Sequence, residues 1–268
     1  MTLFDLLFSL DSSFGEKLQQ GIENACKLAE GIKNAIKRFP IDGFVEVSCS
    51  FALVEHNYPP CLRLSGEQQI SIINMLSNDD TESVSELLLS VYRENIITDI
   101  YQSWIGVVKE ERVPILCEAI ECFFAERYYA CNTRLLSQFG GIIKDNDEVF
   151  KNIEFYDYTA ELASLANEYQ KGKDRSAEKR IVERHFLVNL QGTLLAFAQY
   201  FQKCIFSSGK VDPVIIQNVA NRNKVLHGED CSYGTRLKAL KSIICTDMLI
   251  HLPELQKKIS EEKGNGRH

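Results

Sequence analysis

Apolar residues recur every three or four positions along most of this chain, which is the spacing of a helix that buries one face. The pattern is regular from Phe14 to Arg38 and ends at Pro40. It resumes after a loop at Ser65–Gly66 and predicts three short helices: from Glu67 to a polar break at 78–81, over Glu82–Tyr92 and over Arg93–Trp104. One segment differs, because Phe44–Phe51 partly alternates apolar and polar residues and therefore predicts a short strand.

The helical pattern is clearest from Arg112 onward. Six apolar residues between Ile115 and Phe124 fall on one broad face of a helix. Further helices are expected over Thr133–Ile143, over Tyr158–Tyr169, from residue 181 or 182 to Ile205, and over Arg236–Leu252. Between the last two helices the sequence predicts a loop at Asp212–Pro213, a short apolar turn at Val214–Val219 and a polar stretch at Asn221–Gly234.

The composition agrees with an all-α fold, because 15 Gly and 6 Pro among 268 residues are few for a protein built from many hairpins. We predict a helical bundle at 106–258 and a mostly helical region of unknown role at 1–105. A disordered tail is expected at 259–268.

Cysteine and histidine usage bears on the compartment and on cofactors. The nine cysteines include no CxxC, and several lie in apolar helical patterns, so we interpret them as reduced core residues of a cytoplasmic protein. His56 and His251 have no ligand-like neighbours and are interpreted as surface or core residues. Neither a metal nor another cofactor is therefore expected, and a metal-dependent hydrolase is not favoured.

No membrane association is expected from the sequence. The most apolar stretches are short and interrupted by polar residues, and the apolar N-terminus carries Asp5 and Asp11 without a basic segment. The net charge of −7 argues against a general nucleic-acid coat protein. A basic run at 171–184 is interpreted as a solvated helix face or loop, with contact to RNA phosphates as the alternative.

The segment Asn221–Gly228 (NRNKVLHG) carries residues suited to RNA cleavage. A histidine that titrates near neutrality can move a proton in either direction, and a guanidinium can hold a phosphate through two hydrogen bonds. We expect Arg222 and His227 to lie near one end of a helix pair with their heads able to converge. Gly228 would let the chain leave in a conformation closed to other residues. Spacing alone does not establish this site, because Arg180 and His185 have the same separation; we interpret that pair as part of a helix face.

The wider context of Asn221–Gly228 resembles a known family. An arginine followed directly by Asn223, with a histidine five positions after the arginine, is similar to the Arg-x4–6-His signature of the HEPN superfamily of ribonuclease toxins, abortive-infection proteins and CRISPR effectors. The flanks resemble bacterial members too: Arg112–Asp145 looks like their helical hairpin with its tyrosine link, and Tyr233–Leu252 like the helix after the motif. The resemblance spans about Trp104 to Leu252.

Two positions depart from that family pattern. Relatives often carry a Glu where this chain has Gly140 and Gly141, so an auxiliary acid is missing there. Toxins silenced by nucleotidylation carry a tyrosine two residues after the histidine, a position held here by Glu229; the nearest tyrosine is Tyr233. That mode of control is therefore not expected.

The resemblance implies a helical bundle that dimerises so that two Arg/His motifs share one composite cleft. Such domains cleave RNA without a metal and leave a cyclic phosphate. By the same resemblance Arg222 stabilises the phosphate and the transition state, His227 is the general acid/base and Asn223 positions them. Lys224 is a candidate for contact with RNA phosphates.

The leading hypothesis is a cytoplasmic endoribonuclease, a toxin or antiphage effector that cleaves tRNA or another structured RNA. Its N-terminal region would sense a trigger, bind an antitoxin or sensor protein, or hold the homodimer. The alternative is a catalytically inactive HEPN-like module that binds a nucleotide or a protein in the same cleft.

Overall fold

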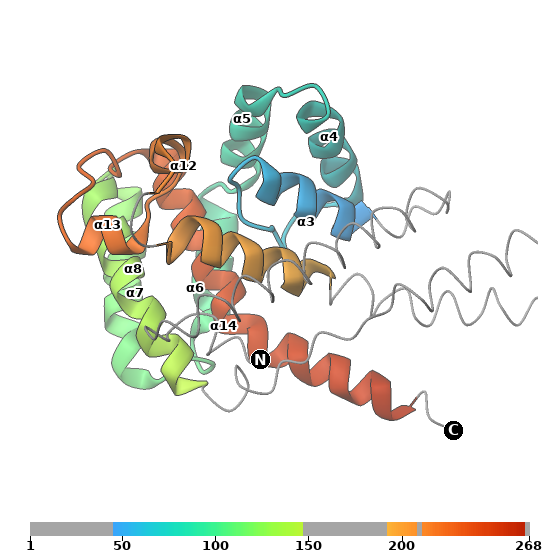
Figure 1. Cartoon of the computed structure of the whole chain (residues 1–268). Coiled ribbons are helices and arrows are strands. Elements are labelled where there is room, and N and C mark those ends of the chain that lie inside the picture. Colours follow the sequence, from blue (N-terminus) through green and yellow to red (C-terminus); the bar gives the residue numbers. More distant parts are fainter. Residues whose placement is uncertain (1–44, 147–191, 208–210, 266–268) are drawn as a thin grey trace, which may run out of the picture.

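The computed structural model describes residues 45–146, 192–207 and 211–265, and every regular element in these ranges is a helix (Figure 1). The all-α prediction is confirmed to this extent. None of the helices in the described ranges is long and apolar enough to cross a membrane. Several predictions fall outside these ranges: the helices at 14–38 and 158–169, the basic run at 171–184, and the pair Arg180 and His185.

The strand predicted at Phe44–Phe51 is wrong, because Val45–Glu55 forms helix α3. Its buried side chains include Val47 and Cys49, which point to nearly opposite sides of the helix, so α3 is covered on most of its surface. A short apolar segment of this kind has no clear period, and packing against neighbours decides its structure. One such neighbour is the helical segment 192–200, where Gly192 lies directly against Val47.

The three short helices that follow agree with the prediction. They are α4 (Gly66–Leu76), α5 (Thr81–Val91) and α6 (Glu94–Trp104). α4 begins at Ser65, whose side chain accepts from the backbone of Gln68 while the Gln68 side chain accepts from the backbone of Ser65. α5 begins at Asp80, which accepts from the backbone of Ser83.

A helical hairpin comes next. The short 3-10 helix η2 (Glu110–Arg112) leads into α7 (Val113–Phe124), which packs along α8 (Tyr128–Asp145). Four apolar residues of the predicted α7 face are buried, whereas Phe124 remains 41% exposed. α8 begins five residues before the predicted Thr133, because the tyrosine link is already helical.

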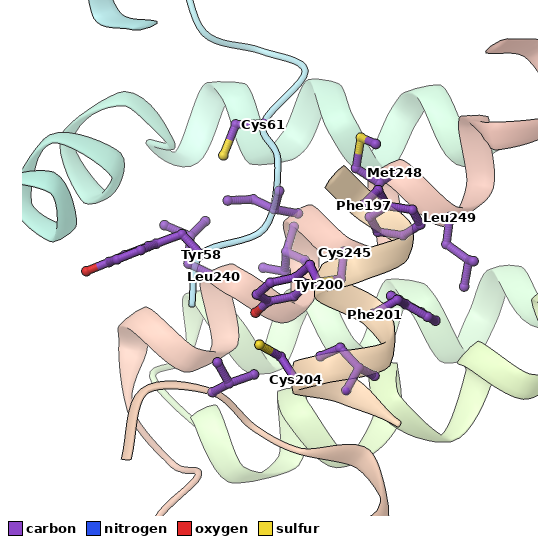
Figure 2. Close-up of a cluster of buried hydrophobic side chains, with 14 of the residues drawn as sticks. Tyr58, Cys61, Phe197, Tyr200, Phe201, Cys204, Leu240, Cys245, Met248 and Leu249 are labelled. Atoms are coloured by element: carbon purple, nitrogen blue, oxygen red, sulfur yellow. The ribbon is translucent and has the colours of Figure 1, made fainter. Parts of the chain in front are cut away.

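The first half of the long helix α14 (Arg236–Asn265) lies among the other described helices, and its second half extends away from them toward the C-terminus (Figure 1). It contacts α5, α6 and α8, and the predicted boundary at residue 105 lies between helices whose buried residues form one core. Figure 2 shows part of that core, where Phe197 and Tyr200 from the segment 192–205 lie beside Met248 and Cys245 of α14. Cys122, Cys204 and Cys245 are buried free thiols, as predicted, and Cys117 is half-buried.

Two local predictions near the C-terminus are wrong. The segment predicted as a turn at Val214–Val219 forms a short helix, α12 (Pro213–Asn218), begun by Asp212, which accepts from the backbone of Val214. Residues 259–265, predicted as a tail, continue α14, and Pro253 lies inside the helix rather than ending it. The proline removes only one backbone donor, and the charged residues beyond it are good helix formers.

Candidate active site

The segment that carries the Arg/His motif forms a five-residue helix, α13 (Arg222–Leu226), which lies against α8 (Figure 1). Its N-cap is Asn221, which is fully buried. The side-chain amide of Asn221 donates to the backbone oxygen of Cys204 (2.9 Å) and to the Ser207 hydroxyl (2.9 Å), and its carbonyl accepts from the backbone of Lys224 (3.0 Å). Asn221 therefore fixes the start of α13 to the end of the segment 192–207. Sequence reasoning assigned it no role, although an Asn directly before a helix is a strong N-cap signal.

Arg222 points into the molecule from the first turn of α13. Its guanidinium carbon lies 5.2 Å from the centre of the Phe206 ring, and its Nη1 donates to the side-chain oxygen of Asn223 (3.2 Å). Its Nε is buried and has no hydrogen-bond partner among the described residues. Burial lowers the pKa of Arg222 below its ordinary value, and no nearby charge offsets that effect. An arginine in this state gains from any anion that reaches it.

The other partly buried arginines of the described residues are different. Arg63, Arg112 and Arg134 each donate to the carboxylate of an Asp or Glu. Arg222 has no carboxylate partner in the part of the chain that the structure describes. Its positive charge is therefore available to a ligand without first breaking an ion pair.

Because Gly140 and Gly141 have no side chains, Arg222 and Arg112 can lie close to the backbone of α8. A Cβ atom at Gly141 would lie 2.4 Å from both terminal nitrogens of Arg112, which donates to Gln138 (2.9 Å) and Asp145 (2.7 Å). A Cβ atom at Gly140 would lie 3.8 Å from Nη2 of Arg222. Arg222 therefore rests against the position at which HEPN proteins often carry a Glu, and this position is neutral here.

Asn223 links Arg222 to the preceding segment. Its amide nitrogen donates to the backbone oxygen of Phe206 (3.0 Å), while its side-chain oxygen accepts from Arg222. Because the same Asn binds a fixed backbone carbonyl and the guanidinium, it restricts where the guanidinium can lie. This geometry is compatible with the positioning role expected for Asn223.

His227 lies at the C-terminal end of α13, and its side chain is exposed. Gly228 follows with φ of 73°, the left-handed conformation expected of it. His227 follows Arg222 by five positions, which places the two residues about 140° apart around the axis of α13. Arg222 therefore faces the interior and His227 the solvent, and no hydrogen bond between them occurs among the described residues. The single chain does not bring the two heads together as expected.

Lys224 already has a partner. Its ammonium forms an ion pair with Glu229, whose side chain is 54% exposed. The hydrogen bond from Lys224 lowers the pKa of Glu229, so the carboxylate is charged at neutral pH. A phosphate that binds Lys224, the residue expected to contact RNA, would therefore meet the Glu229 carboxylate beside it.

Two buried lysines of α14 hold the segments on either side of α13, and sequence reasoning missed both. Lys238 donates to the backbone oxygens of Ile216 (2.7 Å) and Ser232 (3.0 Å). Lys241 donates to the backbone oxygens of Asn57 (2.9 Å) and Asn218 (3.1 Å), with its Nζ 3.6 Å from the centre of the Tyr58 ring. Burial lowers the pKa of Lys241 to about 7. The only signal in the sequence is that both lysines interrupt the apolar pattern of the last helix.

The described residues contain no group of three or more His, Cys, Asp or Glu side chains placed to hold a metal ion. His56 contacts the backbone oxygen of Ala52 (2.9 Å), and His251 contacts Asp247 on its own helix. Both are engaged within the fold, as the sequence suggested.

No protein-family model, curated protein or solved structure matches the chain. The resemblance to the HEPN superfamily therefore stays a prediction drawn from the motif and its flanks.

Proposed function

We propose that the protein is a metal-independent endoribonuclease of HEPN type, a toxin or antiphage effector whose substrate is tRNA or another structured RNA. One observation carries the proposal: Arg222 is half-buried beside Gly140 and Phe206 with no carboxylate partner among the described residues. A desolvated guanidinium without a counter-ion suits a phosphate, and its interaction strengthens as the transferring phosphate gains charge.

The proposed reaction is a transesterification. The ribose 2′-oxygen loses its proton and bonds to the adjacent phosphorus, and the bond from phosphorus to the 5′-oxygen breaks. His227 takes the first proton or supplies the one that the 5′-oxygen requires. Arg222 binds the non-bridging phosphate oxygens, and Asn223 holds the guanidinium in place. The products are a 2′,3′-cyclic phosphate and a 5′-hydroxyl.

A homodimer with a composite site would resolve the separation of the two side chains. A single histidine holds one proton at a time, whereas the reaction removes one proton and delivers another. A second His227, supplied by a second copy of the chain, would allow one histidine to act as base and the other as acid. This dimer is an expectation from the family resemblance and belongs to the proposal.

A second candidate function is supported by the same geometry. Arg222 faces the interior while His227 faces solvent, so one chain alone offers an anion site without an adjacent proton carrier. A module that binds a nucleotide through Arg222 and does not cleave it would have this arrangement. The two candidates differ in whether His227 is needed for an RNA product to form.

The test is cleavage of total RNA and of tRNA by the purified protein in excess EDTA. Arg222→Ala and His227→Ala should each lower the cleavage rate by about 100-fold or more, because each removes a group that acts in the transition state. Arg93→Ala and His56→Ala are matched controls, since Arg93 is exposed and His56 lies at the end of α3. Products ending in a cyclic phosphate are expected from the wild type and from both controls.

A charge-conserving variant separates the two candidates further. Arg222→Lys keeps the positive charge and loses the paired donors, so binding of RNA should largely persist while cleavage falls. RNA binding without any cleavage by the wild type would favour the non-cleaving module. Cleavage that is equal in the wild type and all variants would indicate a contaminating nuclease and refute the proposal.

A further inference from the structure

One face of α8 carries both Gly140 and an exposed tyrosine. Tyr129 precedes Gly140 by eleven residues, which is just over three full turns, so the two positions lie about 20° apart around the axis and about 16 Å apart along it. Thr133 lies one turn after Tyr129 on the same face. Gly140 supports Arg222, so this face leads from the arginine to Tyr129.

The chain from Arg222 to Tyr233 runs alongside this face in the opposite direction. Arg222 lies at Gly140, whereas the Tyr233 hydroxyl accepts from Thr133 (3.2 Å) and the Tyr233 backbone oxygen accepts from Asn132 (2.7 Å). His227 lies between these two ends in the chain and is exposed. This segment therefore forms a track along α8 with the guanidinium at one end and the tyrosine pair at the other.

Tyr129 is held rigidly at the far end of that track. Its hydroxyl donates to the backbone oxygen of Cys231 (3.1 Å), and its ring meets the Tyr233 ring edge to face, with centres 4.9 Å apart. A Cβ atom at Gly234 would lie only 2.1 Å from the Tyr129 ring, so this glycine lets the backbone approach the ring closely. Tyr129 is nevertheless 52% exposed. Part of this tyrosine therefore remains open to a ligand.

We propose that Tyr129 is a base-stacking subsite for the single-stranded part of an RNA whose phosphate lies at Arg222. This inference rests on the proposed function and extends it to substrate recognition. An exposed ring fixed by hydrogen bonds loses little conformational entropy when it stacks on a base, and every base offers a π-face. A span of about 16 Å along α8 separates the ring from the arginine, which a few extended nucleotides can cross.

The RNA that binds this subsite must contain an unpaired base. Bases inside a duplex are covered by their neighbours and cannot stack on a protein ring, so the subsite requires an unpaired base in a loop, bulge or end. Purines, with the larger π-face, should bind better than pyrimidines. Glu229 stands near this track, and its charge is offset by Lys224, so the strand meets no isolated carboxylate there.

The experiment measures RNA binding rather than cleavage. The probe is a short fluorescent oligoadenylate, and its affinity is measured by fluorescence anisotropy in His227→Ala protein, which should not cleave it. Tyr129→Leu should weaken binding by about 10-fold, the loss of one stacked base. Tyr129→Phe keeps the ring and its contact with Tyr233 but loses the hydrogen bond, so it should weaken binding much less than Tyr129→Leu. Phe124→Leu is the matched control, because Phe124 is an exposed aromatic residue on α7.

A second variant and a second probe distinguish the loss of stacking from a folding defect. Gly234→Ala leaves Tyr129 in the sequence but displaces its ring, and should weaken binding as Tyr129→Leu does. An abasic strand of equal length should bind the parent protein and Tyr129→Leu equally. Unchanged oligoadenylate affinity in Tyr129→Leu would overturn the subsite. A loss of affinity for the abasic strand as large as the loss for oligoadenylate would overturn it too, because Tyr129 would then contribute to the fold or to backbone contacts.

These experiments distinguish a failure of the stacking subsite from a failure of the proposed nuclease function. If Arg222→Ala and His227→Ala abolish cleavage while Tyr129→Leu binds and cleaves normally, the nuclease stands and the stacking subsite is refuted. If the wild type neither binds the oligoadenylate nor cleaves RNA, the proposed function fails and the subsite fails with it. A protein partner at Tyr129 would leave all RNA measurements unchanged in Tyr129→Leu and would thus also refute the subsite.

Discussion

Asp247 joins α14 to the helices that precede the hairpin, and its neutralisation should destabilise the fold strongly. Its side chain is 4% exposed and accepts from Nε of Arg63 (3.3 Å) and from the Trp104 indole (3.0 Å). His251 contributes a third contact at 3.2 Å. Burial alone would raise the pKa of Asp247, but the hydrogen bond from His251 and the charge of Arg63 outweigh it, so the pKa lies below its ordinary value.

The magnitude follows from removing one member of a buried charged cluster. Asp247→Asn keeps an acceptor for Trp104 but leaves Arg63 and His251 without their counter-ion, so the loss should lie near the low end of the range for broken buried pairs, about 3 kcal/mol. The matched control is Asp79→Asn, the same chemical change at an aspartate that also faces a histidine, His56, at 3.4 Å. The Asp79 side chain is 95% exposed, so its loss should leave stability essentially unchanged.

Chemical denaturation at neutral pH, followed by circular dichroism, measures both free energies of unfolding. The same loss should lower the Tm of Asp247→Asn by roughly 10 °C for a chain of this size. Equal stabilities for Asp247→Asn and Asp79→Asn, or a loss below about 1 kcal/mol in the former, would refute the reasoning that burial gives this cluster its strength.

The difference in unfolding free energy between the wild type and Asp247→Asn should depend on pH in a definite direction. The hydrogen bond to Asp247 raises the pKa of His251, so its stabilisation is complete below the unfolded pKa of about 6.5 and is lost as pH rises through the folded pKa. The lowered pKa of Asp247 gives stabilisation that is present above its unfolded value and lost as pH falls through the folded pKa. The gap between wild type and Asp247→Asn should therefore be widest between roughly pH 4 and 6.5.

Three further predictions concern other sites. Gly192→Ala should lower stability by about 1–3 kcal/mol in urea unfolding, because its Cβ would meet a valine of α3 at 2.0 Å, whereas Gly66→Ala, with open space around it, should not. Wild-type stability should rise as pH increases from about 7 toward 10.5, because the unfolded chain retains the Lys241 proton that the folded chain releases, and Lys241→Met should remove this rise. Glu229→Gln should free Lys224 and raise affinity for single-stranded RNA by a few-fold in anisotropy titrations, an increase that salt suppresses.

Much of the helical framework was determined by the sequence locally. The apolar spacing and the cap at Ser65 predict α4, and the same rules predict α5, α6 and α7, because helix formation depends on residues within a few positions of one another. The Arg/His segment, its glycine with positive φ and the buried free thiols could likewise be predicted from residue type and spacing.

The tertiary structure alone decided the environment of those residues. Val45–Phe51 is helical because its neighbours cover it, although the pattern of this segment suggested a strand. Arg222 faces inward beside Gly140, and Lys238 and Lys241 bind carbonyls of segments remote in the sequence. Burial, the pKa of a lysine and the absence of a counter-ion arise from contacts between distant segments. A local pattern can therefore identify the Arg/His motif, but packing determines which way each side chain of that motif points.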